Sequence, residues 1–220
     1  MPLKALVFDM DGTLADSDPL HLMAFSDMLR PYGIGMDEDI YRTKISGRTN
    51  AAIFADFFPD RSLEERERMA DDKEAAFRRL VSDLPPLPGL LEVLGWADER
   101  AIKIGLVTNG PPENARHMLD VMQIADRFQV KIVGGDVARG KPDPLPYLTA
   151  LQRLGVAADE ALAFEDSVSG VIAAKAAAIR TVGILTGQTR QTLEEAGADL
   201  LVDDFRAAAL WRELEARCAA

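Results

Sequence analysis

The chain has 220 residues, a formal net charge of −11 and a sequence pI of about 4.7. Nucleic acids and anionic membranes attract basic surfaces, so this acidic balance argues against both as partners. The one cysteine, Cys218, cannot form an internal disulfide, and no apolar run is long enough to span a membrane. We therefore expect a cytoplasmic protein, and we take it to be a monomer.

The most informative stretch lies near the start of the chain. Residues 3–8 form an almost unbroken apolar run, which is typical of a buried central strand of a parallel sheet. The run ends at Asp9, and Asp11 follows one residue later, before Gly12 and Thr13. Carboxylates at the end of a buried strand are costly unless a cation meets them, so both acids are candidates for function.

The next segment is expected to be helical. Residues 16–19, Asp-Ser-Asp-Pro, combine capping side chains with a first-turn proline, which indicates a helix start. Further helix is expected over residues 37–58, with a break at residues 46–50. No strand pattern interrupts this part of the chain.

A longer helix follows these elements. Ser62 and Glu65 have the spacing of a capping box, which predicts a helix that reaches about Val81. Its apolar stripe consists of Leu63, Met69, Phe77 and Leu80. Lys73 falls inside this stripe, where it either extends toward solvent or faces the active site. Three prolines within residues 84–89 then end the helical segment.

Strands alternate with helices after this linker. Strands are predicted at residues 102–107, 130–133, 161–164, 181–184 and 200–202, and helices at 113–125, 145–154, 168–178 and from Asp204 onward. Such alternation is typical of a parallel sheet flanked by helices. We predict an α/β protein with a Rossmann-like core over residues 1–15 and 85–220 and an inserted α-helical cap domain over residues 16–84.

Polar clusters follow four of the predicted strands. In an open α/β sheet, ligands bind beyond the carboxyl ends of the strands. Besides Asp9 and Asp11, the clusters are Thr108-Asn109-Gly110, the loop with Lys141, and Glu165-Asp166-Ser167. One such cluster is more often a helix cap, whereas four complementary clusters on one sheet edge indicate a functional site.

The chemistry of these clusters fits phosphoryl transfer. Asp9, Glu165 and Asp166 offer the hard oxygen ligands that Mg²⁺ prefers. One aspartate could attack phosphorus and form an aspartyl-phosphate. Lys141 and the Thr108 hydroxyl could hold the phosphate oxygens. The second acid of the first pair could protonate the leaving oxygen and later activate water.

The order and spacing of these residues resemble the haloacid-dehalogenase-like phosphatase superfamily over nearly the whole chain. The four matching motifs are Asp9-Met10-Asp11-Gly12-Thr13-Leu14, Thr108, Lys141-Pro142 and Glu165-Asp166-Ser167-Val168-Ser169-Gly170. The resemblance implies that Asp9 is the nucleophile and Asp11 the acid/base. It also implies Mg²⁺ on Asp9, Asp166 and the backbone carbonyl of Asp11, with Glu165 in support. An aspartate at position 11 argues against the dehalogenase and phosphonatase branches.

The helical insert resembles the small cap of the β-phosphoglucomutase-like group, and within it the broad-specificity small-sugar phosphatases. That group pairs a cap lysine with a histidine just after the first motif, which here would be Lys73 and His21. Taken alone, His21 would more often be a surface or packing histidine. Gly47, Arg48 and Asn109 lie in the segments with this likeness and are candidate substrate-binding residues. Arg48 is either a solvated arginine or a fork for a phosphate or sugar oxygen.

The favoured hypothesis is a Mg²⁺-dependent phosphatase that acts on small sugar or polyol phosphate monoesters through an aspartyl-phosphate. The alternatives are a β-phosphoglucomutase and a phosphoglycolate-phosphatase-like hydrolase. A signalling receiver also uses Asp, Mg²⁺, Thr and Lys at strand ends, but it lacks both a cap and an acid at the position of Asp11.

Residues 135–141 have the spacing of a nucleotide-binding P-loop, but Pro142 stands where Ser or Thr would hold Mg²⁺. We therefore reject a P-loop and keep Lys141 as the lysine that neutralises phosphate.

Overall fold

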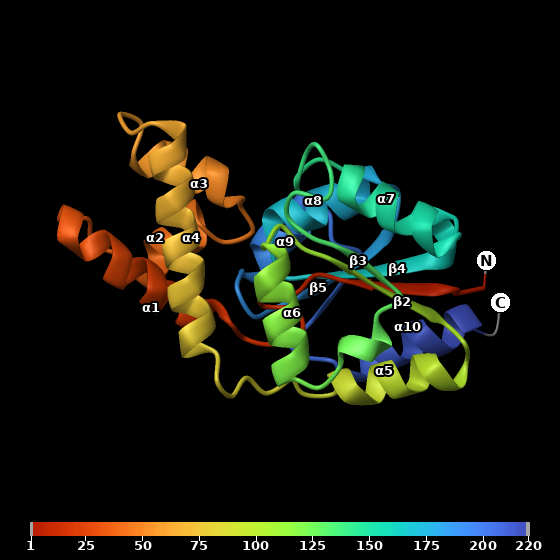
Figure 1. Cartoon of the computed structure of the whole chain (residues 1–220). Coiled ribbons are helices and arrows are strands. Elements are labelled where there is room, and N and C mark those ends of the chain that lie inside the picture. Colours follow the sequence, from red (N-terminus) through yellow and green to blue (C-terminus); the bar gives the residue numbers. More distant parts are fainter. Residues whose placement is uncertain (1, 219–220) are drawn as a thin grey trace.

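The computed structural model describes residues 2–218 as a parallel sheet with helices on both faces and a further group of helices at one end (Figure 1). Within this range six strands pair in parallel, in the order β3-β2-β1-β4-β5-β6. They are β1 (Ala5–Phe8), β2 (Lys103–Val107), β3 (Val130–Ile132), β4 (Ala161–Glu165), β5 (Arg180–Ile184) and β6 (Leu200–Val202). The predicted α/β fold with a Rossmann-like sheet is confirmed.

The helices that follow the linker pack against the sheet. They are α5 (Leu90–Glu99), α6 (Pro112–Val121), α7 (Leu145–Leu154), α8 (Val168–Ala176), α9 (Arg190–Ala196) and α10 (Ala208–Cys218). We did not predict α5 and α9, and α6 and α8 are shorter than we predicted. Gln123 and Ala178 adopt the left-handed backbone conformation, with φ of 58° and 60°, shortly after the last residues of α6 and α8. A left-handed residue cannot continue a right-handed helix, which explains both early ends.

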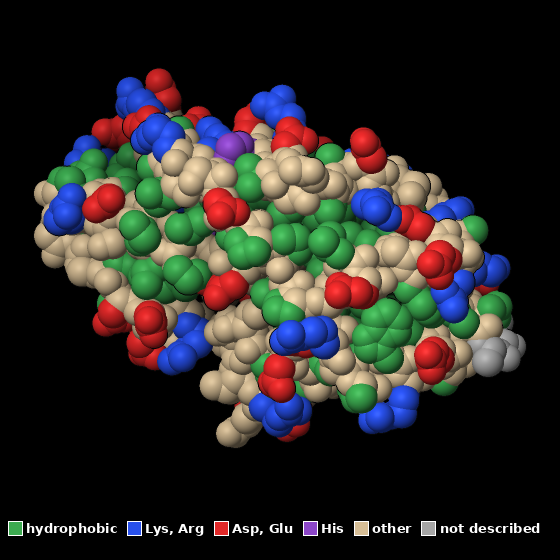
Figure 2. Space-filling model, turned by 90° about the horizontal axis from the view of Figure 1, so that it is seen from below, with side chains coloured by type: hydrophobic (Ala, Val, Ile, Leu, Met, Phe, Trp, Pro, Cys, Tyr) green, Lys and Arg blue, Asp and Glu red, His purple; other side chains and the backbone are tan. Residues whose placement is uncertain are grey.

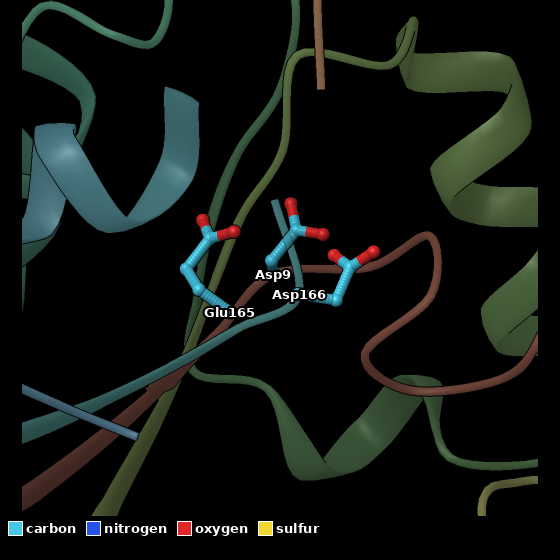
Figure 3. Close-up of side chains that lie close together, drawn as sticks. All are labelled: Asp9, Glu165 and Asp166. Carbon is cyan, nitrogen blue, oxygen red and sulfur yellow. The ribbon is translucent and has the colours of Figure 1, made fainter. Parts of the chain in front are cut away.

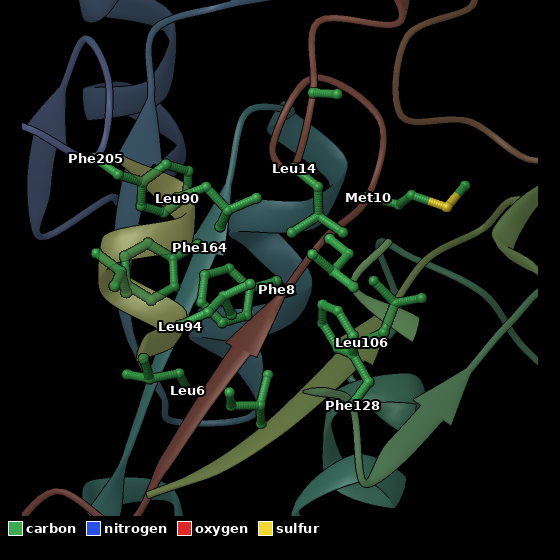
Figure 4. Close-up of a cluster of buried hydrophobic side chains, with 14 of the residues drawn as sticks. Leu6, Phe8, Met10, Leu14, Leu90, Leu94, Leu106, Phe128, Phe164 and Phe205 are labelled. Atoms are coloured by element: carbon green, nitrogen blue, oxygen red, sulfur yellow. The ribbon is translucent and has the colours of Figure 1, made fainter. Parts of the chain in front are cut away.

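β1 lies between β2 and β4, and its side chains alternate between two apolar layers. Leu6 and Phe8 face the layer that α5 and α10 cover, where Phe8 stacks on Phe164 with ring centroids 4.6 Å apart (Figure 4). Ala5 and Val7 face α7 and α8 on the opposite side. Because both faces are covered, all four residues of β1 are buried, which accounts for its unbroken apolar sequence.

The helices between β1 and the linker form their own group, at one end of the sheet in Figure 1. They are α1 (Asp18–Leu29), the 3₁₀ helix η1 (Arg30–Tyr32), α2 (Glu38–Lys44), α3 (Asn50–Phe57) and α4 (Leu63–Leu80). Phe25, Ile53 and Phe54 belong to an apolar cluster separate from those of the sheet. We call residues 16–84 the cap. Its boundaries as a domain stay a prediction.

The capping box at the start of α4 is confirmed. The Ser62 hydroxyl accepts from the backbone N–H of Glu65 at 3.2 Å, and the Glu65 carboxylate accepts from the N–H of Ser62 at 2.9 Å. The predicted apolar stripe is wrong in part, because Leu63 is 61% exposed. The buried face of α4 instead consists of Ala70, Lys73, Glu74 and Phe77.

The N-terminal capping of helix α1 also differs from our prediction. Ser17 occupies the N-cap position, but its side chain makes no hydrogen bond to the helix. Its hydroxyl donates to Asp11 instead, at 2.7 Å. The Ser17 hydroxyl therefore holds the Asp11 carboxylate and makes no bond to the first turn of the helix.

The surface carries charges of both signs. On the face shown in Figure 2, acidic and basic side chains are interspersed with apolar ones, and the visible basic side chains do not form a continuous patch. Across residues 2–218, no helix combines the length and hydrophobicity that crossing a bilayer requires.

Candidate active site

Three carboxylates meet at the carboxyl ends of β1 and β4. Asp9 directly follows β1, Glu165 is the last residue of β4, and Asp166 comes next. The pairing of Phe8 with Phe164 brings these strand ends side by side. All three acids are buried, and one oxygen of each lies within 4.8 Å of the others. Figure 3 shows that the three side chains point to the same side of the sheet edge.

Lys141 supplies a cation to this cluster. Its ammonium group donates to Asp9 Oδ1 and to Glu165 Oε1, each at 2.5 Å. The buried Tyr147 hydroxyl donates to the same Glu165 oxygen, also at 2.5 Å. Lys141 lies in the loop between β3 and α7, so the parallel sheet brings it to the acids from a distant part of the sequence. One ammonium against three carboxylates leaves the cluster with excess negative charge.

Burial, together with the neighbouring acids, raises the proton affinity of two acids in this cluster. Burial raises the pKa of Asp9 from 3.8 to about 8, with Lys141 opposing the shift and Glu165 adding to it. Burial, followed by the charge of Asp9, also raises the pKa of Asp166 well above its ordinary value. Within residues 2–218, the one side-chain hydrogen bond to Asp166 comes from Thr13, at 3.3 Å. Three buried carboxylates with spare oxygen lone pairs fit a hard divalent cation, which would offset the excess charge.

Gly12 allows the loop after β1 to pass close to the cluster. Its φ is +72°, a conformation that favours glycine, and an added Cβ would lie 2.2 Å from Asp166 Oδ2. The backbone N–H of Gly12 donates to the carbonyl of Ala15 at 2.9 Å, which closes a tight turn. This turn leads from Asp9 to the first cap helix.

Asp11 lines the same cavity and takes its partners from the start of α1. Ser17 donates to Asp11 Oδ1 at 2.7 Å, and His21 Nε2 lies 3.0 Å from the same oxygen. Burial raises the pKa of Asp11, but its interactions with His21, the hydrogen bond from Ser17 and the charge of Lys73 lower it more. The net result is a pKa below the ordinary value of 3.8, so Asp11 is a carboxylate in this arrangement.

Lys73 does not extend to solvent. It is 2% exposed, and its Nζ lies 2.9 Å from His21 Nδ1, 3.0 Å from Glu74 Oε1 and 4.2 Å from the centre of the Phe25 ring. An ammonium can only donate, so His21 accepts at Nδ1 and carries its proton on Nε2. That proton is donated to Asp11. Lys73 and His21 therefore form a chain of contacts from α4 to Asp11.

Asn109 joins the loop of Lys141 to the cap. Its Oδ1 accepts from the backbone N–H of Lys141 at 2.9 Å, and its Nδ2 donates to the carbonyl of Gly47 at 3.2 Å. The Ser169 hydroxyl donates to the same Gly47 carbonyl at 2.5 Å. Thr108, which precedes Asn109, is buried and lines the cavity. The loop with Gly47 is thus hydrogen-bonded to the core from two sides.

Arg48 lines the cavity, but its guanidinium is bound within the cap. It donates to the carbonyl of Lys44 at 2.8 Å and to Asp56 Oδ2 at 2.7 Å. Within the described residues, Arg48 therefore borders the site but contacts neither Asp9 nor Asp11. Its guanidinium is therefore paired inside the cap, as is the ammonium of Lys73, which contacts Glu74.

The predicted residues enclose a cavity of about 80 Å³. Its lining includes Asp9, Asp11, His21, Gly47, Arg48, Lys73, Thr108, Asn109, Lys141 and Asp166. Glu165 is not part of the lining and lies fully buried beside Lys141. The structure brings all eleven predicted site residues to one place, from both the cap and the sheet.

Several further residues at this site were not predicted from the sequence. They are Thr13, Ser17, Asp18, Glu74, Asn114 and Tyr147. Glu74 could have been recognised, because it is a second charged residue on the buried face of α4, next to Lys73. Tyr147 and Asn114 lie on helices of the core, where no local pattern separates them from ordinary packing residues.

Comparisons with known proteins point to the same superfamily that the sequence motifs resemble. Residues 6–184 match the haloacid dehalogenase-like hydrolase family. The chain is 36% identical over 207 residues to a phosphorylated carbohydrates phosphatase of Thermotoga maritima, across 91% of this chain and 94% of that protein. It is 31% identical over 208 residues to a β-phosphoglucomutase of Bacillus subtilis, across 91% and 89%.

A solved structure has the same fold. CbbY from Rhodobacter sphaeroides, in complex with xylulose-1,5-bisphosphate, superimposes with a TM-score of 0.83 and 28% identity, covering 92% of this chain and 95% of that one. Together with the family match over residues 6–184, this likeness extends across both the sheet and the cap. The chain therefore belongs to the haloacid dehalogenase-like hydrolases, within the group of enzymes similar to β-phosphoglucomutase and the sugar-phosphate phosphatases.

Proposed function

We propose that the protein is a Mg²⁺-dependent phosphatase that hydrolyses phosphate monoesters of small sugars or polyols through an aspartyl-phosphate on Asp9. One observation carries the proposal: two acids of the buried carboxylate cluster, Asp9 and Asp166, border one small cavity together with Lys141 and a separate acid, Asp11. The phosphatase of Thermotoga maritima, which acts on phosphorylated carbohydrates, supports the substrate class.

The carboxylate cluster fits Mg²⁺ because hard oxygen ligands suit this ion. Asp9, Asp166 and the backbone carbonyl of Asp11 would hold it, and Glu165 would support them. The ion would neutralise phosphate charge and allow the neighbouring acids to stay ionised.

In the first half of the reaction, a carboxylate oxygen of Asp9 attacks phosphorus and the ester P–O bond breaks. Lys141 and the Thr108 hydroxyl hold the equatorial oxygens, where charge accumulates in the transition state. Asp11 gives its proton to the leaving alcohol oxygen. A phosphate ester in the cavity brings negative charge close to Asp11, which raises the proton affinity of this carboxylate before the transfer.

In the second half, a water molecule attacks the phosphorus of the aspartyl-phosphate. Asp11, now a carboxylate, takes the proton from this water, and Asp9 leaves as a carboxylate. The hydrogen bonds from Ser17 and His21 favour the charged form of Asp11, which suits its role as a base.

The cap would select the substrate. His21, Lys73, Gly47 and Arg48 border the cavity from the cap, and Asn109 borders it from the core. Their donors would bind oxygens of the sugar or polyol, whereas the phosphate itself would be held by the core. A cap that closes over the cavity would also limit the access of water before the substrate is in place.

A β-phosphoglucomutase is a second candidate because of one specific observation. Lys73 contacts His21, and His21 contacts Asp11, which is the pairing expected for that group. A mutase would use the same aspartyl-phosphate but transfer the phosphoryl group to a sugar hydroxyl. If β-glucose 1-phosphate gives glucose 6-phosphate faster than free phosphate, the mutase is correct and the phosphatase proposal is wrong.

The direct test is phosphate release from a panel of phosphorylated sugars and polyols. We expect hydrolysis of several members with Mg²⁺ present and its loss when a chelator removes the metal. A parallel preparation of Asp9→Asn controls for contaminating phosphatases. Equal phosphate release with and without Mg²⁺, or from both preparations, would contradict the proposal.

A further inference from the structure

We propose that Glu74 is a positioning residue for Asp11, acting through Lys73 and His21, and that Asn114 holds Glu74 in place from the core. This inference rests on the proposed function, because it assigns Asp11 the role of acid/base. It adds a layer of the site that neither the sequence motifs nor the carboxylate cluster includes.

Glu74 is bound through both carboxylate oxygens. It is 5% exposed on α4. Its Oε1 accepts from Lys73 Nζ at 3.0 Å and from Asn50 Nδ2 at 2.8 Å, and its Oε2 accepts from Asn114 Nδ2 at 2.6 Å. Such a buried carboxylate is fixed in one orientation, because moving it would leave charged oxygens without donors.

Lys73 depends on Glu74 for its charge and its place. Within residues 2–218, Glu74 is the one carboxylate within 4.0 Å of the Lys73 ammonium. Phe25 and Phe77 rings surround the rest of this group, at 4.2 and 5.7 Å. An ammonium in such surroundings needs a carboxylate partner to remain both charged and fixed. Only a fixed, charged Lys73 obliges His21 to accept at Nδ1 and therefore to donate from Nε2 to Asp11.

Asn114 connects this chain of contacts to the core. It lies on α6 and is 1% exposed. Arg78 donates to Asn114 Oδ1 at 2.7 Å, and an arginine can only donate, so the amide must present its N–H groups to Glu74. Because Glu74 is on the cap helix α4 and Asn114 on the core helix α6, their contact forms only when the cap rests on the core. The orientation of Asp11 is thereby coupled to the position of the cap.

A purely structural role for Glu74 would have a different kinetic result. If Glu74 acts through Asp11, its loss should slow the hydrolysis of esters whose leaving group must be protonated. It should have little effect on the hydrolysis of esters whose leaving group needs no proton. The quantity to compare is kcat/KM, since it covers the steps up to cleavage of the ester bond. Misfolding or a poorly seated phosphate would instead lower kcat/KM for every ester to a similar degree.

The experiment measures kcat/KM with Mg²⁺ for glycerol 3-phosphate, which has a poor leaving group, and p-nitrophenyl phosphate, which has a good one. The variants are Glu74→Gln, which has nearly the same shape without charge, and Asn114→Ala, which keeps the Lys73–Glu74 pair. Glu67→Gln, at an exposed position of the same helix, is the matched control. Thermal melting of each protein reports folding.

We expect Glu74→Gln to lower kcat/KM for glycerol 3-phosphate by about 10- to 100-fold and for p-nitrophenyl phosphate by less than about threefold. Asn114→Ala should also lower kcat/KM more for glycerol 3-phosphate than for p-nitrophenyl phosphate, but by a smaller factor. If Glu74→Gln does not fold, the result for Asn114→Ala tests the inference instead. Equal losses on both esters, or no loss on either, would overturn the inference while the wild type remains active. A wild type that hydrolyses neither of these esters nor any member of the panel of sugar and polyol phosphates would instead overturn the proposed function.

Discussion

Asp11 depends on residues outside its own motif. The sequence motif places it two residues after Asp9, but Ser17 and His21 of the cap determine its orientation and its charge. Asp9 is held differently, by Lys141 of the core. The two acids are therefore controlled by two separate parts of the molecule, which suits a nucleophile and an acid/base that must differ in proton affinity.

The first prediction concerns the acid/base. Asp11→Asn should lower kcat/KM for a sugar phosphate by about 10²- to 10⁴-fold, because the amide can neither give nor take the proton. The loss for p-nitrophenyl phosphate should be much smaller. Steady-state kinetics on both esters checks this, with Asp16→Asn, at an exposed position nearby, as the control. Unchanged kinetics on the sugar phosphate would exclude Asp11 as the acid.

Single residues also show where sequence analysis succeeds and fails. Asp9, Glu165 and Lys141 could be predicted to meet, because the carboxyl ends of parallel strands share one edge. Ser17 was assigned to a helix cap, because its choice of Asp11 as partner depends on a turn that the local pattern does not reveal. Asn114 was missed because its partner, Glu74, lies 40 positions away, on a cap helix.

The loop between α2 and α3 is the element that joins the cap to the core beside the site. Gly47 has a φ of +71°, and an added Cβ would lie 2.6 Å from Ser169 Oγ. Its carbonyl receives hydrogen bonds from both Ser169 and Asn109. The backbone of this loop, rather than a charged side chain, thus makes the contact with the core.

The second prediction uses two glycines with nearly the same backbone conformation. Gly33→Ala should cost about 1–2 kcal/mol of stability, because φ is positive there. Gly47→Ala should cost more than this, because φ is positive there too and the added Cβ would also meet Ser169. Only Gly47→Ala should also raise KM for a sugar phosphate, since an added Cβ at Gly33 meets no atom within 4 Å. Equal KM values for the two variants would show that the loop need not rest against Ser169.

Predictability also varied among the elements. The capping box of α4 was recognised because its signal is local, and the structure has both hydrogen bonds. The N-cap residue of α5, Gly89, is in the left-handed conformation and has no side chain to cap the helix, so α5 lacks such a signal. α9 does have a capping residue, Thr189, which accepts from the N–H of Thr192. Helix α9 could therefore have been predicted from this capping residue.

At the scale of the whole molecule, the site lies where the cap meets the sheet. The sheet supplies the carboxylate cluster and Lys141, and the cap supplies the chain from Lys73 through His21 to Asp11. The alternation of strands and helices was enough to predict the sheet. How the cap rests on it could not be predicted, because that depends on contacts such as Glu74 with Asn114, between residues far apart in the sequence.

The third prediction concerns metal binding by the intact protein. Mg²⁺ should raise the melting temperature, because it offsets the charge of Asp9, Glu165 and Asp166 in the folded state alone. At 100 times its Kd the stabilisation should be about 2.7 kcal/mol. Asp166→Asn should lose most of this effect and melt at a higher temperature than the wild type without metal. An equal Mg²⁺ shift in both proteins would place the metal elsewhere.

The central claim, that Asp9 carries the phosphoryl group, has one direct test. The wild type is mixed with a ³²P-labelled sugar phosphate and Mg²⁺, quenched in acid within the first turnover, and digested for peptide mapping. The account predicts label on the peptide that contains Asp9, and none after the same treatment of Asp9→Asn. Label on a different residue, or rapid phosphate release by the Asp9→Asn protein, would contradict it.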